Sequence, residues 1–292
     1  MREALHLDHT GHIVRDLGAA AALYRRMGFR LTPLSHHQTP GRDGCMVPAG
    51  TANQCAMLPR GYLEIMGVTD RSADSYSARE AGGFLDAFEG LHLLAFGTAD
   101  RDATQARLER DGVACAPREL GRMIDTATGP AEARFRLLTV AAMSDESRSF
   151  FFIEHATRDL LWQPDLTVHE NGALGLAELV IVTDDPGGLE QTLNRTFGVN
   201  GTPEGPAIIW RLDRSALVVT TAADADDRFG VSVARRDIPH AAGQVIEVAD
   251  MAALAGLLQR NAVPFCRHRD RLTVAPADAM GVALQFAPAG GA

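Results

Sequence analysis

Residues 7–28, LDHTGHIVRDLGAAAALYRRMG, decide the fold, because they place the signals for a strand, a helix start and a helix stop in direct succession. Residues 7–14 alternate between side-chain types as a strand does. Asp16 stands where an N-cap is expected, and Gly28 stands where the helix would end. The stretch therefore predicts one strand and one amphipathic helix, whose apolar stripe must pack on a sheet.

The same pattern of strand and helix returns three more times along the chain. The later copies cover 90–113, 176–199 and 243–263, with Asp100, Asp185 and Asp250 in the capping positions. Short β-rich runs broken by Gly, Pro and Asp follow each predicted helix, as in CAMLPRGYLEIMGV at 55–68. Each unit therefore reads as βαβββ, and neighbouring units should pair, since one unit alone is too small for a good core.

Two irregular segments divide this repeat. Residues 156–173 are polar and contain proline, which indicates a linker between two domains, 1–158 and 172–292. Residues 33–54 are rich in Gly and Pro and are predicted to form a long loop. Loops of this length in a compact domain are usually functional or mobile.

The composition excludes several classes of protein. The chain has 292 residues, of which 46% are hydrophobic and 22% charged, so it is neither disordered nor a coiled coil. All 28 of its basic residues are arginines, which excludes Schiff-base chemistry, a P-loop lysine and a lysine general base. The net charge is −9, and an acidic chain with scattered arginines is not expected to bind nucleic acid.

The amino terminus and the cysteines predict a cytoplasmic protein. The first residues, MREALHLDHTGHIV, lack the apolar core of a signal peptide, and no stretch is long and apolar enough for a membrane span. The four cysteines of the chain are widely spaced and form no CxxC pair, so their pattern indicates neither a zinc site nor a disulfide framework. The alanine-rich, lysine-free usage is typical of a GC-rich bacterial genome.

Three short motifs resemble the vicinal oxygen chelate superfamily, which contains glyoxalase I, extradiol dioxygenases and bleomycin-resistance proteins. They are the DH dipeptide of the first strand, the GTAN run at 50–53 that follows His37, and GYLEIM at 61–66. The last two are similar to its glyoxalase-like branch. The resemblance implies an α+β fold in which the four βαβββ modules pair into two cupped-sheet domains, with a metal held by the first and last strands of paired units.

The resemblance also implies a set of metal ligands in the first domain. They are His9, Glu64, His92 and Glu154. Two imidazoles and two carboxylates suit an open site for divalent Ni, Co, Mn, Zn or Fe. His92 lies one residue further from its capping aspartate than His9 does, so a β-bulge must absorb the additional residue if His92 is to face the site.

Strand alternation indicates which neighbours share a face with each predicted ligand. Glu64 shares its face with Tyr62, which suits a ligand in a mixed environment. Glu154 shares its face with Phe152, and a carboxylate beside an apolar wall needs a cation or a hydrogen bond. His155 points to the other face and is the alternative ligand if the strand is turned the other way.

The second domain does not repeat this set of ligands. At the corresponding places stand Glu178, Val219, Gly243 and Gln285. Valine and glycine offer no metal-binding side chain, and one acid with one amide does not hold an ion well. Residues 174–292 are therefore predicted to serve in packing, in dimerisation or in lining a second pocket.

The leading functional prediction is a metal-dependent lyase or isomerase of the glyoxalase type that acts on a small oxygenated organic substrate. Glu154 or Glu64 would take the proton next to a carbonyl. The residues expected to contact the substrate are Asn53, His37, Tyr62 and Phe152. The alternatives are an Fe(II) ring-cleaving dioxygenase and a metal-free protein that binds hydrophobic ligands. The protein is expected to be a homodimer without membrane or nucleic-acid partners.

Overall fold

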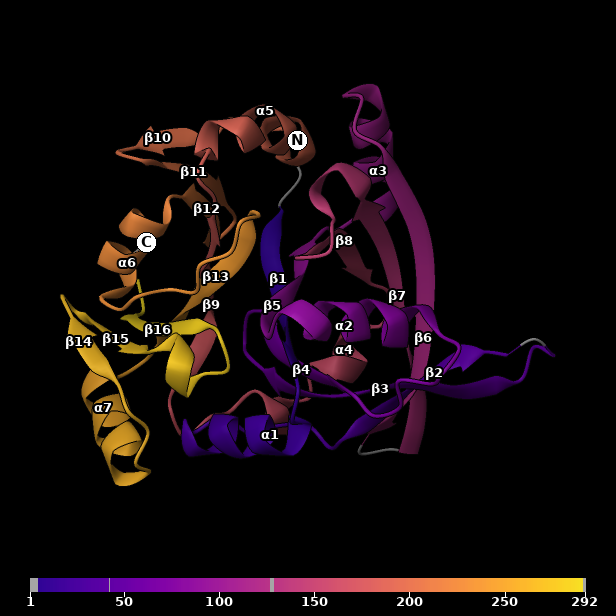
Figure 1. Ribbon diagram of the computed structural model, residues 1–292. Helices are drawn as coiled ribbons and strands as arrows, with labels where there is room; N and C mark the ends of the chain where they lie inside the picture. Colours follow the sequence, from indigo (N-terminus) through magenta and orange to yellow (C-terminus); the bar gives the residue numbers. More distant parts are fainter. Residues whose placement is uncertain (1–4, 42, 127–128, 291–292) are drawn as a thin grey trace.

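The computed structural model describes residues 5–41, 43–126 and 129–290, and each half of the chain forms one eight-stranded sheet (Figure 1). The outer ends of the two predicted domain ranges, 1–4 and 291–292, lie outside the described residues. Each sheet contains two βαβββ modules whose first strands pair antiparallel at its centre. The predicted α+β fold with two cupped-sheet domains is therefore confirmed.

The first sheet has the strand order β2-β3-β4-β1-β5-β8-β7-β6 and the second has the matching order β10-β11-β12-β9-β13-β16-β15-β14. The strands of the first sheet are β1 His6–Val14, β2 Ser35–Pro40, β3 Met46–Met57, β4 Tyr62–Val68, β5 Gly90–Gly97, β6 Cys115–Thr126, β7 Gly129–Val140 and β8 Ser149–His155. Those of the second are β9 Ala173–Val182, β10 Thr202–Glu204, β11 Ala207–Leu212, β12 Ser215–Thr220, β13 His240–Val248, β14 Cys266–His268, β15 Arg271–Val274 and β16 Ala283–Pro288.

The helices fall into two groups. Those of the four modules are α1 Leu17–Arg26, α3 Arg101–Arg110, α5 Glu190–Phe197 and α7 Met251–Arg260. The others are α2 Tyr76–Ala87, α4 Arg158–Leu161 and α6 Ala222–Phe229, with 3₁₀ turns at Ala141–Met143, Pro164–Leu166, Pro186–Leu189 and Pro276–Asp278. Within the ranges that the structure describes, every helix is too short or too polar to cross a bilayer.

The capping aspartates act as the sequence predicts. The side chain of Asp16 accepts a hydrogen bond from the backbone N–H of Ala19 at 2.8 Å, and Asp100 and Asp250 cap their helices in the same way. Asp185 differs, because it caps a 3₁₀ turn that leads into α5. These bonds satisfy backbone donors that a helix start would otherwise leave unpaired.

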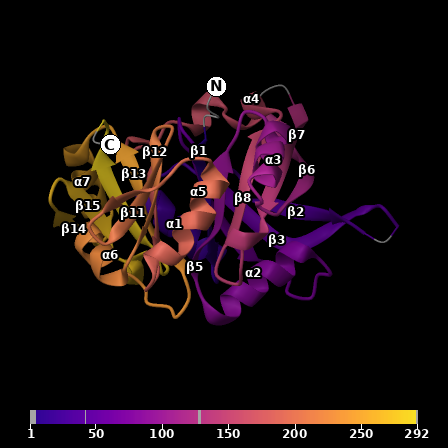
Figure 2. The same ribbon diagram turned by 90° about the horizontal axis from the view of Figure 1, so that it is seen from above.

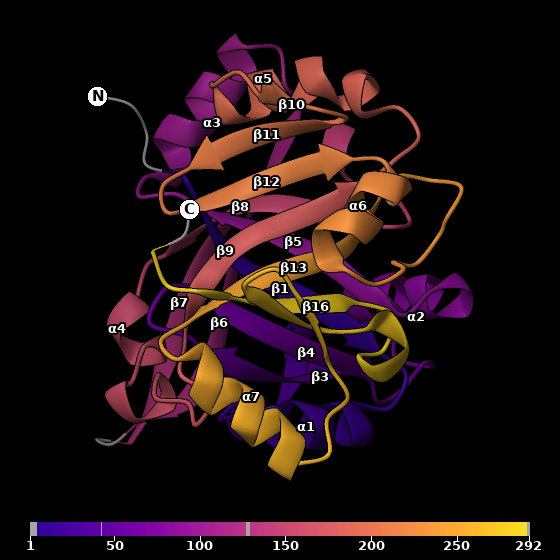
Figure 3. The same ribbon diagram turned by 90° about the vertical axis from the view of Figure 1, so that its left-hand side faces the viewer.

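The two sheets pack against each other through one shared hydrophobic core. Phe96 and Phe150 of the first sheet and Leu179 and Phe286 of the second belong to this core and are fully buried. Helix α1 lies beside α7, and α3 lies beside α5, so the module helices of both halves border the same core (Figures 2 and 3). Each sheet therefore has an inner face in the shared core and an outer face turned away from it.

The outer faces are covered by the helices that lie outside the repeat. Helix α2 lies over the first sheet and α6 over the second (Figures 1 and 3). Phe84 of α2 packs with Ile13 and Met66 on the first sheet, and Phe229 of α6 packs with Val245 on the second. Neither helix belongs to the repeat predicted from the sequence. Both faces of each sheet are thus buried over much of their area.

The prediction of a long loop at 33–54 is wrong, because most of this segment forms a β-hairpin. Strands β2 and β3 pair antiparallel, with Ser35 opposite Asn53 and Pro40 opposite Met46, and the hairpin projects from the body of the molecule (Figure 2). The side chains of β2 alternate between half-buried and exposed positions. A strand with so little apolar burial lacks the alternation of apolar and polar residues by which strands are identified in a sequence.

The buried residue His12 makes stability depend on pH. Its Nε2 donates to the backbone oxygen of Met280 at 3.0 Å, and its Nδ1 accepts from the hydroxyl of Tyr24 at 3.0 Å. Burial lowers its pKa from 6.5 to about 4. As the pH falls from about 6.5 to about 4, His12 therefore becomes protonated in the unfolded chain while it stays neutral in the folded chain.

Stability should thus fall as the pH falls through this window, and His12 alone should account for about 2 kcal/mol of the free energy of unfolding between pH 7 and pH 5. Urea titrations at both pH values measure the effect. In the variant His12→Gln, which has no group that titrates at this position, the difference between the two pH values should shrink by that amount. Equal pH dependence in both proteins would contradict the assignment.

Candidate functional site

Polar side chains gather on the outer face of the first sheet, on its central strands. His9 on β1 lies opposite Tyr62 on β4, and their rings stack with centroids 4.1 Å apart. His155 at the end of β8 shares this face with Phe151 and Ile153. His9 is 3% exposed and Glu64 on β4 is 9% exposed, so these groups have little contact with bulk water.

The first part of this face is a cluster of Asp8, His9 and His155, called the Asp8 cluster. Asp8 Oδ1 lies 2.7 Å from His9 Nδ1 and 3.0 Å from His155 Nε2. His6 Nε2 lies 3.6 Å from the other carboxylate oxygen. One possible ligand atom from each of the three residues lies within 4.8 Å of the others, and this is the one group of that kind in the described part of the chain.

A β-bulge brings adjacent residues of β1 together at this cluster. Leu7 pairs with Phe96, and His9 pairs with the preceding residue Ala95, so Asp8 is an additional residue without a partner on β5. Such a bulge bends the strand and redirects the side chains beside it. Asp8 and His9 therefore reach one another, although neighbours in a regular strand point to opposite faces.

The charge of Asp8 makes this cluster suited to a cation. Burial alone would raise the pKa of Asp8, but the charge and hydrogen bond of His155, with further hydrogen bonds from His6 and His9, hold it well below its ordinary value. Asp8 is 3% exposed and remains ionised, with its charge balanced by the imidazoles around it, and a bound cation could take over that role.

The donor set of the Asp8 cluster also fits a divalent metal ion. Two imidazoles and one carboxylate are ordinary ligands for Zn, Fe and related ions. Ligands about 2.1 Å from such an ion and at a right angle to each other lie roughly 3 Å apart. The separations of 2.7 and 3.0 Å within the cluster are close to that value.

The second part of the face surrounds Glu64. Its Oε1 accepts a hydrogen bond from Asn53 Nδ2 of β3, and Arg122 of β6 extends to 3.5 Å from Asn53 Oδ1. His37 of β2 lies close enough for its charge to interact with those of Glu64 and Arg122, and its Nδ1 is 2.9 Å from Thr51 Oγ1. Burial lowers the pKa of His37, which keeps its ring neutral near pH 7.

Tyr62 connects these two parts. Burial raises its pKa well above 10, and the negative charges of Asp8 and Glu64 on either side add to the effect. Its ring contacts His9 and His155 of the Asp8 cluster and the indole of Trp162. The hydroxyl therefore keeps its proton and can act as a hydrogen-bond donor on this face.

The structure places five of the predicted site residues around Tyr62 on this face and separates the other three from them. The five are His9, His37, Asn53, Tyr62 and Glu64. His92 has the bulge that its spacing required, since Gly11 pairs with Leu93 and His12 with Leu91. Its ring packs on Phe84 beneath α2 instead, and its Nε2 lies 3.6 Å from Glu80 Oε1. Both ring nitrogens are buried, and among the described residues neither has a hydrogen-bond partner.

Glu154 and Phe152 point to the inner face of the first sheet. Glu154 Oε2 accepts from the backbone N–H of Arg101 at 2.9 Å and from Arg136 Nη1 at 3.0 Å. Phe152 is fully buried in the shared core beside Phe96. The four predicted ligands are therefore not brought together, because β8 turns His155 rather than Glu154 toward the outer face.

Two residues of the site are not among those predicted from the sequence. Asp8 belongs to the DH dipeptide of the first strand, and an aspartate within a strand is rarely buried without a partner, which is a signal for a site residue. Arg122 is one of many arginines in the chain, and nothing in its sequence neighbourhood distinguishes it. Its place on the outer face results from the pairing of the long strands β6 and β7.

Comparison with known proteins identifies relatives by sequence pattern and by fold. A family model described as "Glyoxalase-like domain" matches residues 7–197, which is more than half of the chain. No curated protein matches the sequence. A hypothetical protein from Staphylococcus aureus has a similar structure, with a TM-score of 0.63 and 12% identity over 97% of this chain and 99% of that one.

Two further solved structures share the fold. One is a mutant of 4-hydroxymandelate synthase from Streptomyces coelicolor, with a TM-score of 0.60 and 12% identity over 100% of this chain and 94% of that one. The other is a xylose isomerase-like TIM barrel/4-hydroxyphenylpyruvate dioxygenase fusion protein, with a TM-score of 0.55 and 11% identity over 98% of this chain and 49% of that one. At such low identity these likenesses show the fold alone.

Proposed function

The chain belongs to the glyoxalase-like domain family of the vicinal oxygen chelate superfamily, and from this we propose that it is a metal-dependent enzyme acting on a small oxygenated organic substrate. Members of this superfamily commonly bind a divalent metal ion. The proposed active site is the outer face of the first sheet, where the Asp8 cluster and Glu64 lie on either side of Tyr62.

The Asp8 cluster is the observation that carries this proposal. Asp8, His9 and His155 are the proposed metal ligands, in place of the set of four that the resemblance implied. A bound metal ion would supply electrophilic polarisation of a substrate oxygen. The buried carboxylate of Asp8 favours a cation at this position whichever reaction follows.

The residues around Glu64 support a lyase or isomerase reaction. Glu64 is the proposed general base that takes a proton from the carbon next to a carbonyl, and the amide of Asn53 holds its carboxylate in place. The protonated hydroxyl of Tyr62 can donate a hydrogen bond to a substrate oxygen. Arg122 can bind an anionic group of the substrate on the same face.

A specific observation also favours the second candidate, an Fe(II) dioxygenase. The Asp8 cluster contains two imidazoles and one carboxylate, which is the combination that non-haem Fe(II) oxygenases use. In this case the remaining coordination positions would be free for oxygen and substrate. The metal-free binding protein is the third candidate and is the one that a failure to bind metal would favour.

Metal analysis and two reaction assays separate these candidates. Protein purified without chelator is expected to contain about one transition-metal ion per chain by mass spectrometry. Solvent deuterium that enters pyruvate or hydroxyacetone next to the carbonyl indicates proton transfer and supports the lyase or isomerase. Oxygen uptake with bound iron and 4-hydroxyphenylpyruvate or catechol supports the dioxygenase. Protein that binds none of Mn, Fe, Co, Ni or Zn contradicts both enzyme proposals.

A further inference from the structure

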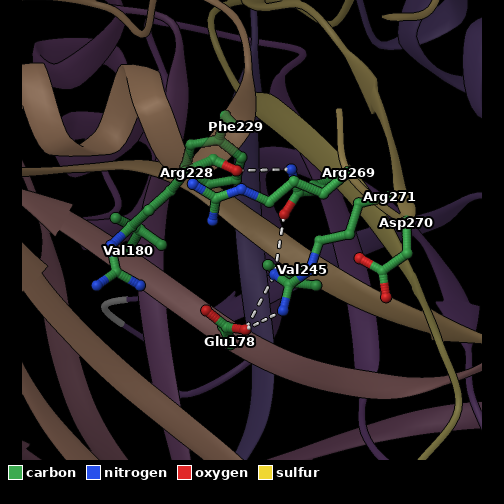
Figure 4. A pocket seen from close by; sticks show the side chains of 9 residues that line it. Glu178, Val180, Arg228, Phe229, Val245, Arg269, Asp270 and Arg271 are labelled. Carbon is green, nitrogen blue, oxygen red and sulfur yellow. Dashed lines mark hydrogen bonds and ion pairs between the residues drawn. The ribbon is translucent and has the colours of Figure 1, made fainter. Parts of the chain in front are cut away.

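The outer face of the second sheet contains a pocket of about 210 Å³ (Figure 4). Strands β9, β13 and β16 form its floor, and the end of α6 and the start of β15 form its sides. Glu178 lies seven residues before the capping Asp185, as His9 lies seven before Asp16, so this floor corresponds to the proposed active site of the first sheet. The pocket has its own polar groups and does not depend on the proposed function.

An ion pair fixes the floor of this pocket. Arg271 donates from Nη1 and Nη2 to Glu178 Oε1, both at 3.1 Å, and its Nη1 also donates to Gln285 Oε1 at 3.0 Å. Gln285 Nε2 in turn donates to Thr273 Oγ1 and to the backbone oxygen of Arg228. These bonds neutralise Glu178 and hold Arg271 in one position before any ligand arrives.

The hydrogen-bond donors that remain on the arginines, rather than the net charge of the pocket, favour an anion. Three arginines and two acidic residues line it, and each arginine is paired with one acid: Arg228 with Asp224, Arg269 with Asp227 and Arg271 with Glu178. Arg228 bonds to Asp224 through Nε at 2.6 Å, and within the described residues its two terminal nitrogens have no hydrogen-bond partner. Arg269 likewise uses only Nη2 to contact Asp227. Guanidinium N–H groups therefore remain for a ligand.

Apolar side chains complete the wall. Val180 and Val245 on the floor strands and Phe229 at the end of α6 also line the pocket, and all three belong to the buried cluster under α6. A site that combines an apolar wall with a guanidinium group suits an organic carboxylate, because the guanidinium binds a carboxylate through two parallel hydrogen bonds. The volume is below the usual range for drug-sized ligands, so the molecule must be small.

We propose that this pocket of the second sheet binds a small organic carboxylate. The carboxylate would accept hydrogen bonds from the terminal nitrogens of Arg228, and the body of the ligand would lie against Val180 and Val245. Glu178 Oε2, the oxygen that does not bond to Arg271, would accept a hydrogen bond from a hydroxyl group of the ligand. The protein would then have two separate small-molecule sites, one on the outer face of each sheet.

Calorimetric titration with benzoate and with pyruvate tests this proposal, with benzamide and pyruvamide as the matched uncharged compounds. At least one of the two carboxylates is expected to bind saturably and at least tenfold more tightly than its amide. The variant Arg228→Gln should weaken that binding about tenfold or more, since a hydrogen bond to a charged group is lost. Arg211→Gln is the control, because Arg211 pairs with Glu204 on the surface of the same sheet.

Three results would overturn the proposal. The first is that neither carboxylate binds more tightly than its amide. The second is that Arg228→Gln, folded by circular dichroism, binds as the wild type does. If Arg228→Gln does not fold, Arg228→Lys takes its place, because lysine keeps the charge but lacks the paired N–H groups. The third is that binding is lost in Asp8→Asn but kept in Arg228→Gln, which would place the carboxylate in the first sheet.

Discussion

Replacing Asp8 with asparagine is expected to weaken the binding of a divalent metal ion at least about 100-fold, because it removes the charged donor of the cluster and leaves two neutral imidazoles. Asparagine has nearly the same shape, so His9 and His155 should stay in place. Metal content after dialysis, measured by mass spectrometry, and titration with Co²⁺ or Zn²⁺ give the affinity of each protein.

Glu154→Gln is the matched control for this prediction. Glu154 is also a carboxylate at the end of β8 next to His155, but it bonds to Arg101 and Arg136 on the inner face of the sheet. The variant should therefore keep the metal affinity of the wild type. If Glu154→Gln lost the metal while Asp8→Asn retained it, the ligand set implied by the family resemblance would be the correct one.

Replacing Glu64 with glutamine is expected to lower kcat about 10²- to 10⁴-fold without changing the metal content, because it removes the proposed general base and leaves the Asp8 cluster intact. The glutamine amide can still hydrogen-bond to Asn53, so the change concerns proton transfer rather than shape. The rate at which solvent deuterium enters the substrate measures this step directly.

Glu80→Gln serves as the comparison for Glu64. Glu80 belongs to α2, which covers the same face, and it lies beside His92 rather than beside Tyr62. Its replacement should leave the exchange rate within about twofold of the wild type. An equal loss of rate in both variants would show that the general charge of the face matters and that Glu64 has no special role.

Most of the fold could be predicted from the sequence because its signals are local. A capping aspartate such as Asp16 fixes the start of each module helix within one or two turns of the chain, and the repetition of that signal reveals the modules. By contrast, α2 contains two adjacent glycines and α6 is short and acidic. Neither segment has a high intrinsic helix propensity, and both helices are stabilised by packing their apolar side chains on the face of a sheet.

The orientation of β8 could not be predicted, and it decides the site. Alternation correctly groups Phe152 with Glu154 and Phe151 with His155. Alternation does not tell which group faces the shared core, because the run SFFFIEH is apolar on both sides. Both faces of this sheet are buried, one by the shared core and the other by the outer helices. The bulge at Asp8 is equally invisible, because it depends on the register with β5.

The common core of the two sheets makes the stability of each half of the chain depend on the other half. The inner faces of the two sheets cover each other, with the module helices around them, so a chain that lost one sheet would expose a broad layer of phenylalanine and leucine side chains to water. The halves should therefore melt as a single cooperative unit. A destabilising substitution of Trp210, which lies on β11 of the second sheet, would then reduce the fraction of molecules in which the Asp8 cluster is folded.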